Sequence, residues 1–223
     1  SLLLVAFPSA AYAAPGDLDG TFSSDGKLTT NFASGFDGAF GVVVQSDGRI
    51  VAPGAAAGGG GRFGLARYNA DGSLDVTFGG DGRVTTNFTS KFDASSALAL
   101  QSDGKIVVAG LAGGRLVYGD DQKFALARYN ADGSLDTTFS GDGKVTTNLT
   151  SGPEFAHSVA IQDDGKIVAA GRGSGGGGRM ALSRYNADGT LDTSFSGDGR
   201  LTTNFTARDD RAEKVMVQGD SKI

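Results

Sequence analysis

The sequence predicts an all-β fold in which tandem units each form a four-stranded antiparallel sheet. The pattern Gln-x-Asp-Gly-Lys/Arg-Ile recurs with its aspartates 56 and 61 residues apart at Asp47, Asp103 and Asp164, and an altered copy follows 56 residues later at Asp220. A Leu-Asp pair keeps the same spacing at Leu18, Leu74, Leu135 and Leu191. No window shows the apolar period of a helix. Units repeated at this length bury their apolar faces against their neighbours.

The first half of each unit is predicted to be a β-hairpin. In the second copy, residues 97–101 form a short apolar run, and Asp103-Gly104 is a strong signal for a tight turn. Residues 105–109 then form a β-branched run, which is typical of a strand. These two runs are the first and second strands of the unit.

The second half of the unit supplies two more strands. Residues 123–129 alternate between two faces, and the turn-forming residues 130–134 follow them. A further Asp-Gly turn at 142–143 precedes residues 144–149, which alternate again. The second copy therefore has four strands, with 97–101 innermost and 144–149 outermost.

Four-stranded units of this length in tandem predict the blades of a β-propeller, present here as a partial ring. Residues 27–32 resemble an outermost strand without the other three, and we expect this orphan strand to be able to complete the last blade and close the ring. The predicted boundaries are 14–39 for the region of the orphan strand, 40–95, 96–155 and 156–211 for three blades, and 212–223 for the start of a fourth.

The N-terminus differs from the repeats. Residues 2–7 are a short apolar run, and Ala11-Tyr12-Ala13 matches a signal-peptidase site, so residues 1–13 are predicted to be the end of a Sec-type secretory signal peptide. The run is too short to span a bilayer. We expect a fragment of a longer bacterial protein, secreted or held at the cell surface. The alternative is a buried or amphipathic N-terminal strand.

Composition excludes several classes of function. The net charge is −5 and acidic and basic residues are interspersed, so we expect no nucleic-acid partner and no membrane insertion of the mature chain. The chain has no cysteine, which excludes disulfides, thiolate chemistry and cysteine-ligated metals. It also has no tryptophan, which weakens the case for an aromatic carbohydrate platform.

Residues 97–110 and 124–139 resemble the delta-60 repeat of bacterial secreted and surface proteins. The resemblance covers almost everything after about residue 17. It implies a β-propeller, often within a large extracellular protein, and it implies no particular activity. Pro53 is a departure, because it interrupts the first copy.

One repeated motif has the residues of a calcium loop. Asn130, Asp132 and Asp136 alternate around a glycine turn, and hard cations need several such oxygens to converge. Arg128 stands where the first carboxylate ligand would be. We therefore favour an Asx-type turn in which Asp136 pairs with the arginine or with backbone N–H groups, and we expect no cofactor, with calcium as the alternative.

A second carboxylate recurs just before each innermost strand. The four copies are Asp37, Asp93, Glu154 and Asp210. They could line one rim of a central channel as a ring of negative charge that holds a cation or a basic ligand. The simpler interpretation, which we favour, is that each carboxylate caps a turn.

Positions that break the repeat are the candidates for binding, because function on a repeated scaffold needs asymmetry. One such position lies at the start of each innermost strand and holds Phe40, Ser96, His157 and Glu213. The second is an elaborated loop at 111–123, five residues longer than its copies, which carries Arg115, Tyr118, Asp120 and Asp121. We expect these two groups to lie on opposite edges of the blades.

Three functions remain open from the sequence. The first is a binding or display scaffold without catalysis of its own, whose partner is a protein or a glycan. The second is a propeller enzyme, a hydrolase or lyase, that uses repeats outside this sequence. The only histidine in this sequence is His157, so a Ser-His-Asp arrangement would depend on that residue alone. The third is a structural stalk stabilised by calcium.

Overall fold

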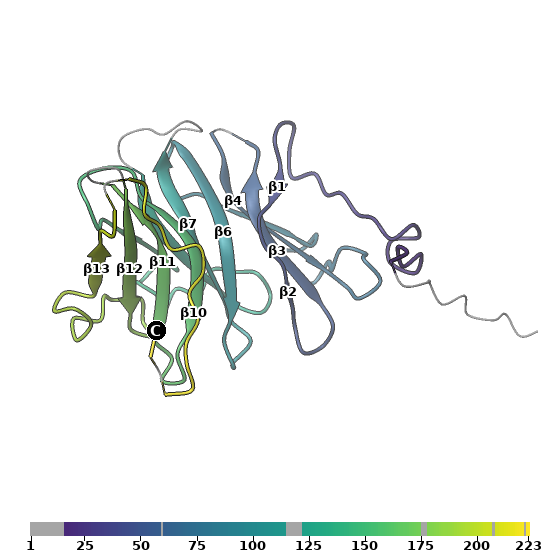
Figure 1. Cartoon of the computed structure of the whole chain (residues 1–223). Coiled ribbons are helices and arrows are strands. Elements are labelled where there is room, and N and C mark those ends of the chain that lie inside the picture. The colour runs from purple at the N-terminus through teal and green to yellow at the C-terminus, as the bar shows by residue number, and fades with distance from the viewer. Residues whose placement is uncertain (1–15, 59, 115–121, 175–177, 207, 221) are drawn as a thin grey trace, which may run out of the picture.

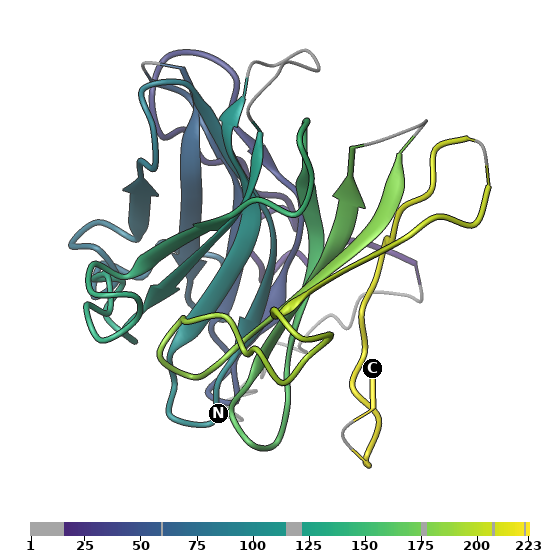
Figure 2. The same cartoon turned by 90° about the vertical axis from the view of Figure 1, so that its left-hand side faces the viewer.

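The computed structural model describes residues 16–58, 60–114, 122–174, 178–206, 208–220 and 222–223. Three antiparallel sheets stand side by side along the chain (Figure 1), and we call them the first, second and third blades. In the described residues every regular element is a strand. The sheets fan out without closing into a ring (Figure 2). The chain is therefore an open array of β-propeller blades.

Each blade has its strands in sequence order. The second blade contains β6(Phe92–Leu100), β7(Ile106–Gly114), β8(Lys123–Tyr129) and β9(Lys144–Thr147). The third contains β10(Phe155–Ile161), β11(Ile167–Gly173), β12(Arg179–Tyr185) and β13(Arg200–Thr203). The first contains β1(Gly38–Ala39), β2(Val43–Val44), β3(Ile50–Ala56), β4(Arg62–Tyr68) and β5(Arg83–Thr86). The predicted strand order is confirmed.

The predicted hairpin tips also form. At the tip between β6 and β7, the Gln101 amide donates to the Lys105 carbonyl at 2.9 Å and the Gly104 amide donates to the Gln101 carbonyl at 3.0 Å. Gly104 has φ of +83°, a conformation that glycine adopts without steric cost. The Asp103 carboxylate accepts the Lys105 amide at 3.1 Å, so the Asp-Gly pair shapes the turn.

β3 runs without a break through Pro53, and the interruption in the first blade falls in the innermost strand opposite it. The innermost strand is divided into β1 and β2, and both pair with β3. Between them the Phe40 amide still donates to the Pro53 carbonyl at 3.0 Å. Pro53 has no amide hydrogen to donate to Phe40 in exchange, so the ladder lacks one hydrogen bond there.

The hydrophobic core lies between the blades. Leu98 and Leu100 of β6 pack toward the first blade, against a cluster that includes Val51, Phe63 and Leu65. The alternate residues of β6 pack toward the third blade. Because the side chains of a strand alternate between its two faces, each innermost strand joins two cores.

The segment before the first blade occupies the place of an outermost strand. Residues 27–32 are not assigned as a strand, contrary to expectation. The Tyr68 hydroxyl nevertheless donates to Thr30 Oγ1 at 2.8 Å, as Tyr129 does to Thr86 and Tyr185 to Thr147. Among the described residues, no strand forms a ladder with this segment.

Residues 212–220 lie along the third blade without forming a regular strand (Figure 1). The Ala212 amide donates to the Gly171 carbonyl at 3.0 Å, and Val215 is buried in the core cluster of that blade. This segment covers the third blade where the innermost strand of a fourth blade would lie.

Candidate functional site

The strand ends that flank the elaborated loop lie at the same edge of the blades as the start of the innermost strand, which corrects the expectation of opposite edges. Phe92, at the start of β6, pairs with Gly114, at the end of β7. Phe155, at the start of β10, likewise pairs with Arg172 near the end of β11. An antiparallel hairpin places the start of its first strand beside the end of its second. We call this side of the molecule the loop edge.

A backbone contact joins the elaborated loop to the next innermost strand. The Glu154 amide donates to the Gln122 carbonyl at 3.0 Å, so the chain entering β10 lies beside the chain that leaves the loop. Residues 111–114 belong to β7, and Lys123 begins β8, so the loop itself is shorter than the sequence suggests. Four predicted binding residues, Arg115, Tyr118, Asp120 and Asp121, lie outside the described residues.

In the second and third blades, the variable position at the start of the innermost strand coincides with a β-bulge. The register of β6 shifts between Ser95 and Ala97, and that of β10 shifts between Ala156 and Ser158. The extra residues are Ser96 and His157. A bulged residue leaves the ladder, and bulges commonly redirect a side chain beside a functional site. The repeated glycine on the strand opposite the bulge is required, because a Cβ on Gly110 would collide with the Ala94 carbonyl.

His157 is half-buried on the loop edge. Its ring lies 4.4 Å from the ring of Phe155. Burial lowers the pKa of His157, and the negative charge of Glu213 acts in the opposite direction. The structure thus brings together two predicted binding residues that are 56 positions apart in the sequence.

Glu213 itself belongs to a chain of ion pairs. Arg211 binds Glu213 and lies 3.8 Å from Asp209. Asp209 in turn binds Arg172 of β11 at 2.6 Å between the carboxylate and Nε. Opposite charges therefore alternate around His157, and the group can offer both donors and acceptors to a polar partner.

The recurrent carboxylate before each innermost strand is a structural cap. Asp93 is fully buried and accepts four hydrogen bonds, from the Phe88 amide at 2.9 Å, the Thr89 amide at 3.0 Å, the Thr89 hydroxyl at 2.9 Å and the Gly113 amide at 3.0 Å. Asp37 and Asp210 accept amides at matching positions. These oxygens are engaged by the backbone, which supports the capping interpretation over a ring of free charge.

Glu154 departs from this pattern. Its Oε1 accepts the Leu149 amide at 2.7 Å and both the amide and the hydroxyl of Thr150. Its Oε2 is buried and makes no hydrogen bond of standard geometry to the described residues, although the Phe124 amide lies near enough to lower the pKa of Glu154. Thr150 Oγ1 accepts the Ser174 amide at 3.0 Å. Burial raises the pKa of Glu154.

The candidate calcium residues form a turn and an ion pair. Asp132 Oδ1 accepts the amide and the hydroxyl of Ser134, and Asn130 Nδ2 donates to the same hydroxyl at 3.0 Å. Asp136 accepts Arg128 Nε at 2.7 Å through Oδ2. Within the described ranges no three His, Cys, Asp or Glu side chains form a group suited to a metal ion. The preference for a cofactor-free turn stays a prediction.

The arginine of this motif also joins neighbouring blades. Arg128 Nη1 donates to the Ala187 carbonyl of the third blade, and the guanidinium carbon lies 4.9 Å from the centroid of the Phe139 ring. Arg67 makes the same contacts with Ala131 and Phe78 one blade earlier. These repeated residues are thereby committed to assembly of the array.

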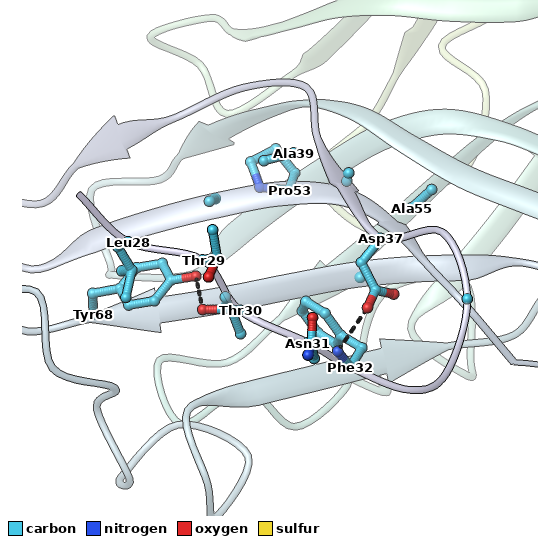
Figure 3. Close-up of a pocket in the computed structure, with 16 residues that line it drawn as sticks. Leu28, Thr29, Thr30, Asn31, Phe32, Asp37, Ala39, Pro53, Ala55 and Tyr68 are labelled. Atoms are coloured by element: carbon cyan, nitrogen blue, oxygen red, sulfur yellow. Dashed lines mark hydrogen bonds between the residues drawn. The ribbon is translucent and has the colours of Figure 1, made fainter.

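A cavity of about 380 Å³ lies between residues 28–32 and the first blade (Figure 3). Its wall is made largely of small residues of β3 and β4, and the bond from Tyr68 to Thr30 closes one side. Between the first and second blades the corresponding space is filled by Val51, Phe63 and Leu65. We therefore interpret this cavity as the packing face of a blade.

Two features of the loop edge were not anticipated from the sequence. The bulges at Ser96 and His157 depend on the pairing register, which no local pattern reveals. The shared edge could have been found by following strand direction, because alternating strands place the start of the first strand and the loop between the second and third strands at the same edge.

Comparison with known families agrees with this architecture. A family model described as a domain of unknown function (DUF5122) β-propeller matches residues 45–78, 101–139 and 162–195. Each matched segment runs from the end of an innermost strand to the phenylalanine beneath the motif arginine. No curated protein matches the chain. Three segments of the chain are thus similar to a β-propeller family, and the bulged positions lie outside the matched segments.

Proposed function

We propose that this array of β-propeller repeats is a binding or display scaffold that works outside the cell and has no catalytic activity of its own. The observation that carries the proposal is that the elements that break the repeat meet at one edge of the blades. The strand ends that flank the elaborated loop share the loop edge with the starts of the innermost strands, and the contact between Glu154 and Gln122 joins the end of the loop to the chain that enters β10. The repeated residues, in contrast, are occupied by turns, caps and contacts between blades.

The proposed site comprises the elaborated loop and the rim beside it. His157 projects from a bulge and Glu213 lies close enough to influence its charge. Arg115, Tyr118, Asp120 and Asp121 of the loop are proposed to complete the contact. The mixture of charge and aromatic surface suits an extracellular protein or a glycan.

Export is the second part of the proposal. Residues 1–13 have the composition and cleavage signal of a secretory signal peptide, and the finer resemblance to delta-60 repeats supports a secreted or surface protein. No helix in the described part of the chain is long and apolar enough to cross a membrane. Fractionation of expressing cells and N-terminal sequencing test this, with a mature N-terminus at Ala14 expected and a retained leader in the cytoplasm as the contrary result.

Binding is tested on two printed panels, one of neutral and acidic oligosaccharides and one of purified extracellular proteins. Three variants are compared with the natural chain: replacement of residues 115–121 by Gly-Gly, His157→Ala and Glu213→Ala. Loss of binding in the loop variant or in a rim variant supports the site. If all three variants bind a detected partner as the natural chain does, the proposed site is wrong.

A further inference from the structure

We propose that the third blade carries a preformed socket that binds an Asn-x-Asp-Gly turn of a further β-propeller repeat from outside this sequence. Three groups form the socket, namely the Arg184 guanidinium, the Phe195 ring and the Ser196 amide. Tyr185, next to Arg184, pairs with Ile167, which directly follows the hairpin tip of the same blade. The socket therefore lies at the edge that carries the hairpin tips, opposite the loop edge, and the inference goes beyond the proposed function.

The junction between the first and second blades shows what such a socket holds. Residues 130–133 are the Asn-Ala-Asp-Gly turn of the second blade. Arg67 Nη1 of the first blade donates to the Ala131 carbonyl at 2.5 Å, and the Gly79 amide donates to the Asp132 carbonyl at 2.8 Å. Two successive carbonyls of the turn are thus bound by one guanidinium and one amide.

The junction between the second and third blades repeats both bonds. Arg128 Nη1 donates to the Ala187 carbonyl, and the Ser140 amide donates to the Asp188 carbonyl at 2.7 Å. The same pair of donors therefore meets the same pair of acceptors at each complete junction, although glycine occupies the amide position in one blade and serine in the other.

The glycine of the turn packs on the phenylalanine of the socket. A Cβ on Gly133 would lie 3.0 Å from the Phe78 ring, and one on Gly189 would lie 2.9 Å from the Phe139 ring. Both glycines have positive φ, which adds a second reason for glycine at this place. The ring therefore selects a turn that carries no side chain at its fourth residue.

On the third blade the same groups stand ready without a turn. Arg184 stacks over the Phe195 ring at 4.8 Å, compared with 4.6 and 4.9 Å in the first two blades. Within the described residues, neither Arg184 Nη1 nor the Ser196 amide makes a hydrogen bond. Phe195 is half-buried, whereas Phe78 and Phe139 are fully buried against their turns.

The backbone of the socket is also set in advance. Ser196 has φ of +54°, the same value as Ser140, whose amide holds a turn. A residue with a side chain occupies this region at a cost of about 1 kcal/mol or more. The third blade keeps this conformation where no turn is bound, so less ordering is needed when a partner binds.

The partner must present a free turn, and a second copy of this chain has none among its described residues. The three Asn-Ala-Asp-Gly turns begin at Asn69, Asn130 and Asn186. The second and third are held by the preceding blades. The first is held by the N-terminal segment, where the Ser23 amide donates to the Asp71 carbonyl at 2.8 Å. We therefore assign the socket to a repeat that this sequence does not contain.

Nuclear magnetic resonance of the full chain tests the socket with a head-to-tail cyclic peptide that has the sequence of residues 129–135. The two ends of this segment pair in the structure, so a ring holds the turn. We expect the Ser196 amide resonance to shift and saturate on titration. The amides of Gly79 and Ser140 already hold turns and should not respond.

Variants of the arginine identify the contact. Arg184→Ala should weaken binding about tenfold, the value of one charge-assisted hydrogen bond. Arg184→Lys should weaken it similarly, because lysine keeps a charge beside Asp192 but has no second nitrogen to direct at the turn. Arg179→Ala, at the other end of the same strand, is the matched control and should bind normally. Unchanged thermal midpoints for Arg184→Lys separate loss of the contact from loss of folding.

A second peptide with Gly133→Ala should bind at least about tenfold more weakly, because its Cβ would meet the ring. No shift of the Ser196 resonance, equal binding of the two peptides, or unchanged binding by both Arg184 variants overturns the socket. Variants of the loop edge lie at the opposite edge and should bind the peptide normally, so failure of the socket leaves the proposed function standing.

Discussion

Arg128 and Asp136 form a buried ion pair at 2.7 Å, with 6% of each side chain exposed, and the same arginine donates to the Ala187 carbonyl of the next blade. One residue thus closes a turn within its own blade and fastens that blade to its neighbour. Arg67 and Asp75 repeat the arrangement one blade earlier at 2.8 Å. The array is held together by these arginine–aspartate pairs as well as by its apolar cores.

Arg128→Ala should therefore lower the free energy of unfolding by about 3 kcal/mol, because it leaves the buried Asp136 carboxylate with only the more distant Lys105, at 3.4 Å, as a charge partner and removes the bond to Ala187. Arg184→Ala is the matched control, since that side chain is 18% exposed and its described bonds, to Asp192 and Ser194, stay within its own motif. Urea unfolding of both variants measures the difference. Equal losses would show that the contact between blades contributes little.

Asp136 should contribute to loss of stability in acid. Burial opposes its ionisation, but the bonds from Thr138 and the charges of Arg128 and Lys105 outweigh burial and lower its pKa from 3.8 to about 2. Because the pKa is lower in the folded state, the stabilisation is complete above about pH 4 and is lost as the pH falls toward 2. Asp136→Asn should flatten the dependence of unfolding free energy on pH in this window. An unchanged slope would contradict the assignment.

Glu154 should have the opposite effect. Burial raises the pKa of Glu154 above 4.5. The free energy of unfolding is therefore not reduced by this residue below that pH, and it falls as the pH rises through the folded pKa. Glu154→Gln should therefore be more stable than the natural chain at pH 7, by about 1 kcal/mol, and equal to it near pH 4. Thermal unfolding at the two pH values measures this, and a destabilised variant at pH 7 would show that the charge has a partner.

Removal of calcium should leave the thermal midpoint unchanged. The oxygens of Asp132 and Asp136 already accept hydrogen bonds from Ser134, Thr138 and Arg128. Calcium at a hundred times its dissociation constant would add about 2.7 kcal/mol of stability, which a thermal scan detects readily. A clear fall in the midpoint on adding chelator would make the motif a metal site.

Replacing residues 115–121 by Gly-Gly should preserve folding, with a change in unfolding free energy within about 0.5 kcal/mol. The control is an exchange that also replaces residues 111–114, which form the end of β7. Leu111 is buried there, and substituting the alanine of the first blade for it should cost about 2 kcal/mol or more. Equal stability of the two exchanges would show that the end of β7 does not support the sheet.

Strands, turns and blade order could be predicted from the sequence because they depend on local patterns. The turn at Asp103-Gly104 needs a glycine with positive φ, and the alternation of residues 123–129 matches the two faces of a strand. The repeat supplied each signal three times. The pairing of Asp136 with Arg128 was likewise within reach, because the two residues recur together at a fixed separation.

Tertiary structure decided the features on which the candidate site depends. The bulge at His157 arises from the pairing register of β10 with β11, and the nearness of Glu213 to it arises from the packing of one repeat on the next. The longer side chain of Glu154 changed the capping bonds in a way that only the positions of the surrounding amides could show. Patterns along a chain report the conformation of each strand, whereas the contacts between strands and between blades depend on how their side chains fit together in space.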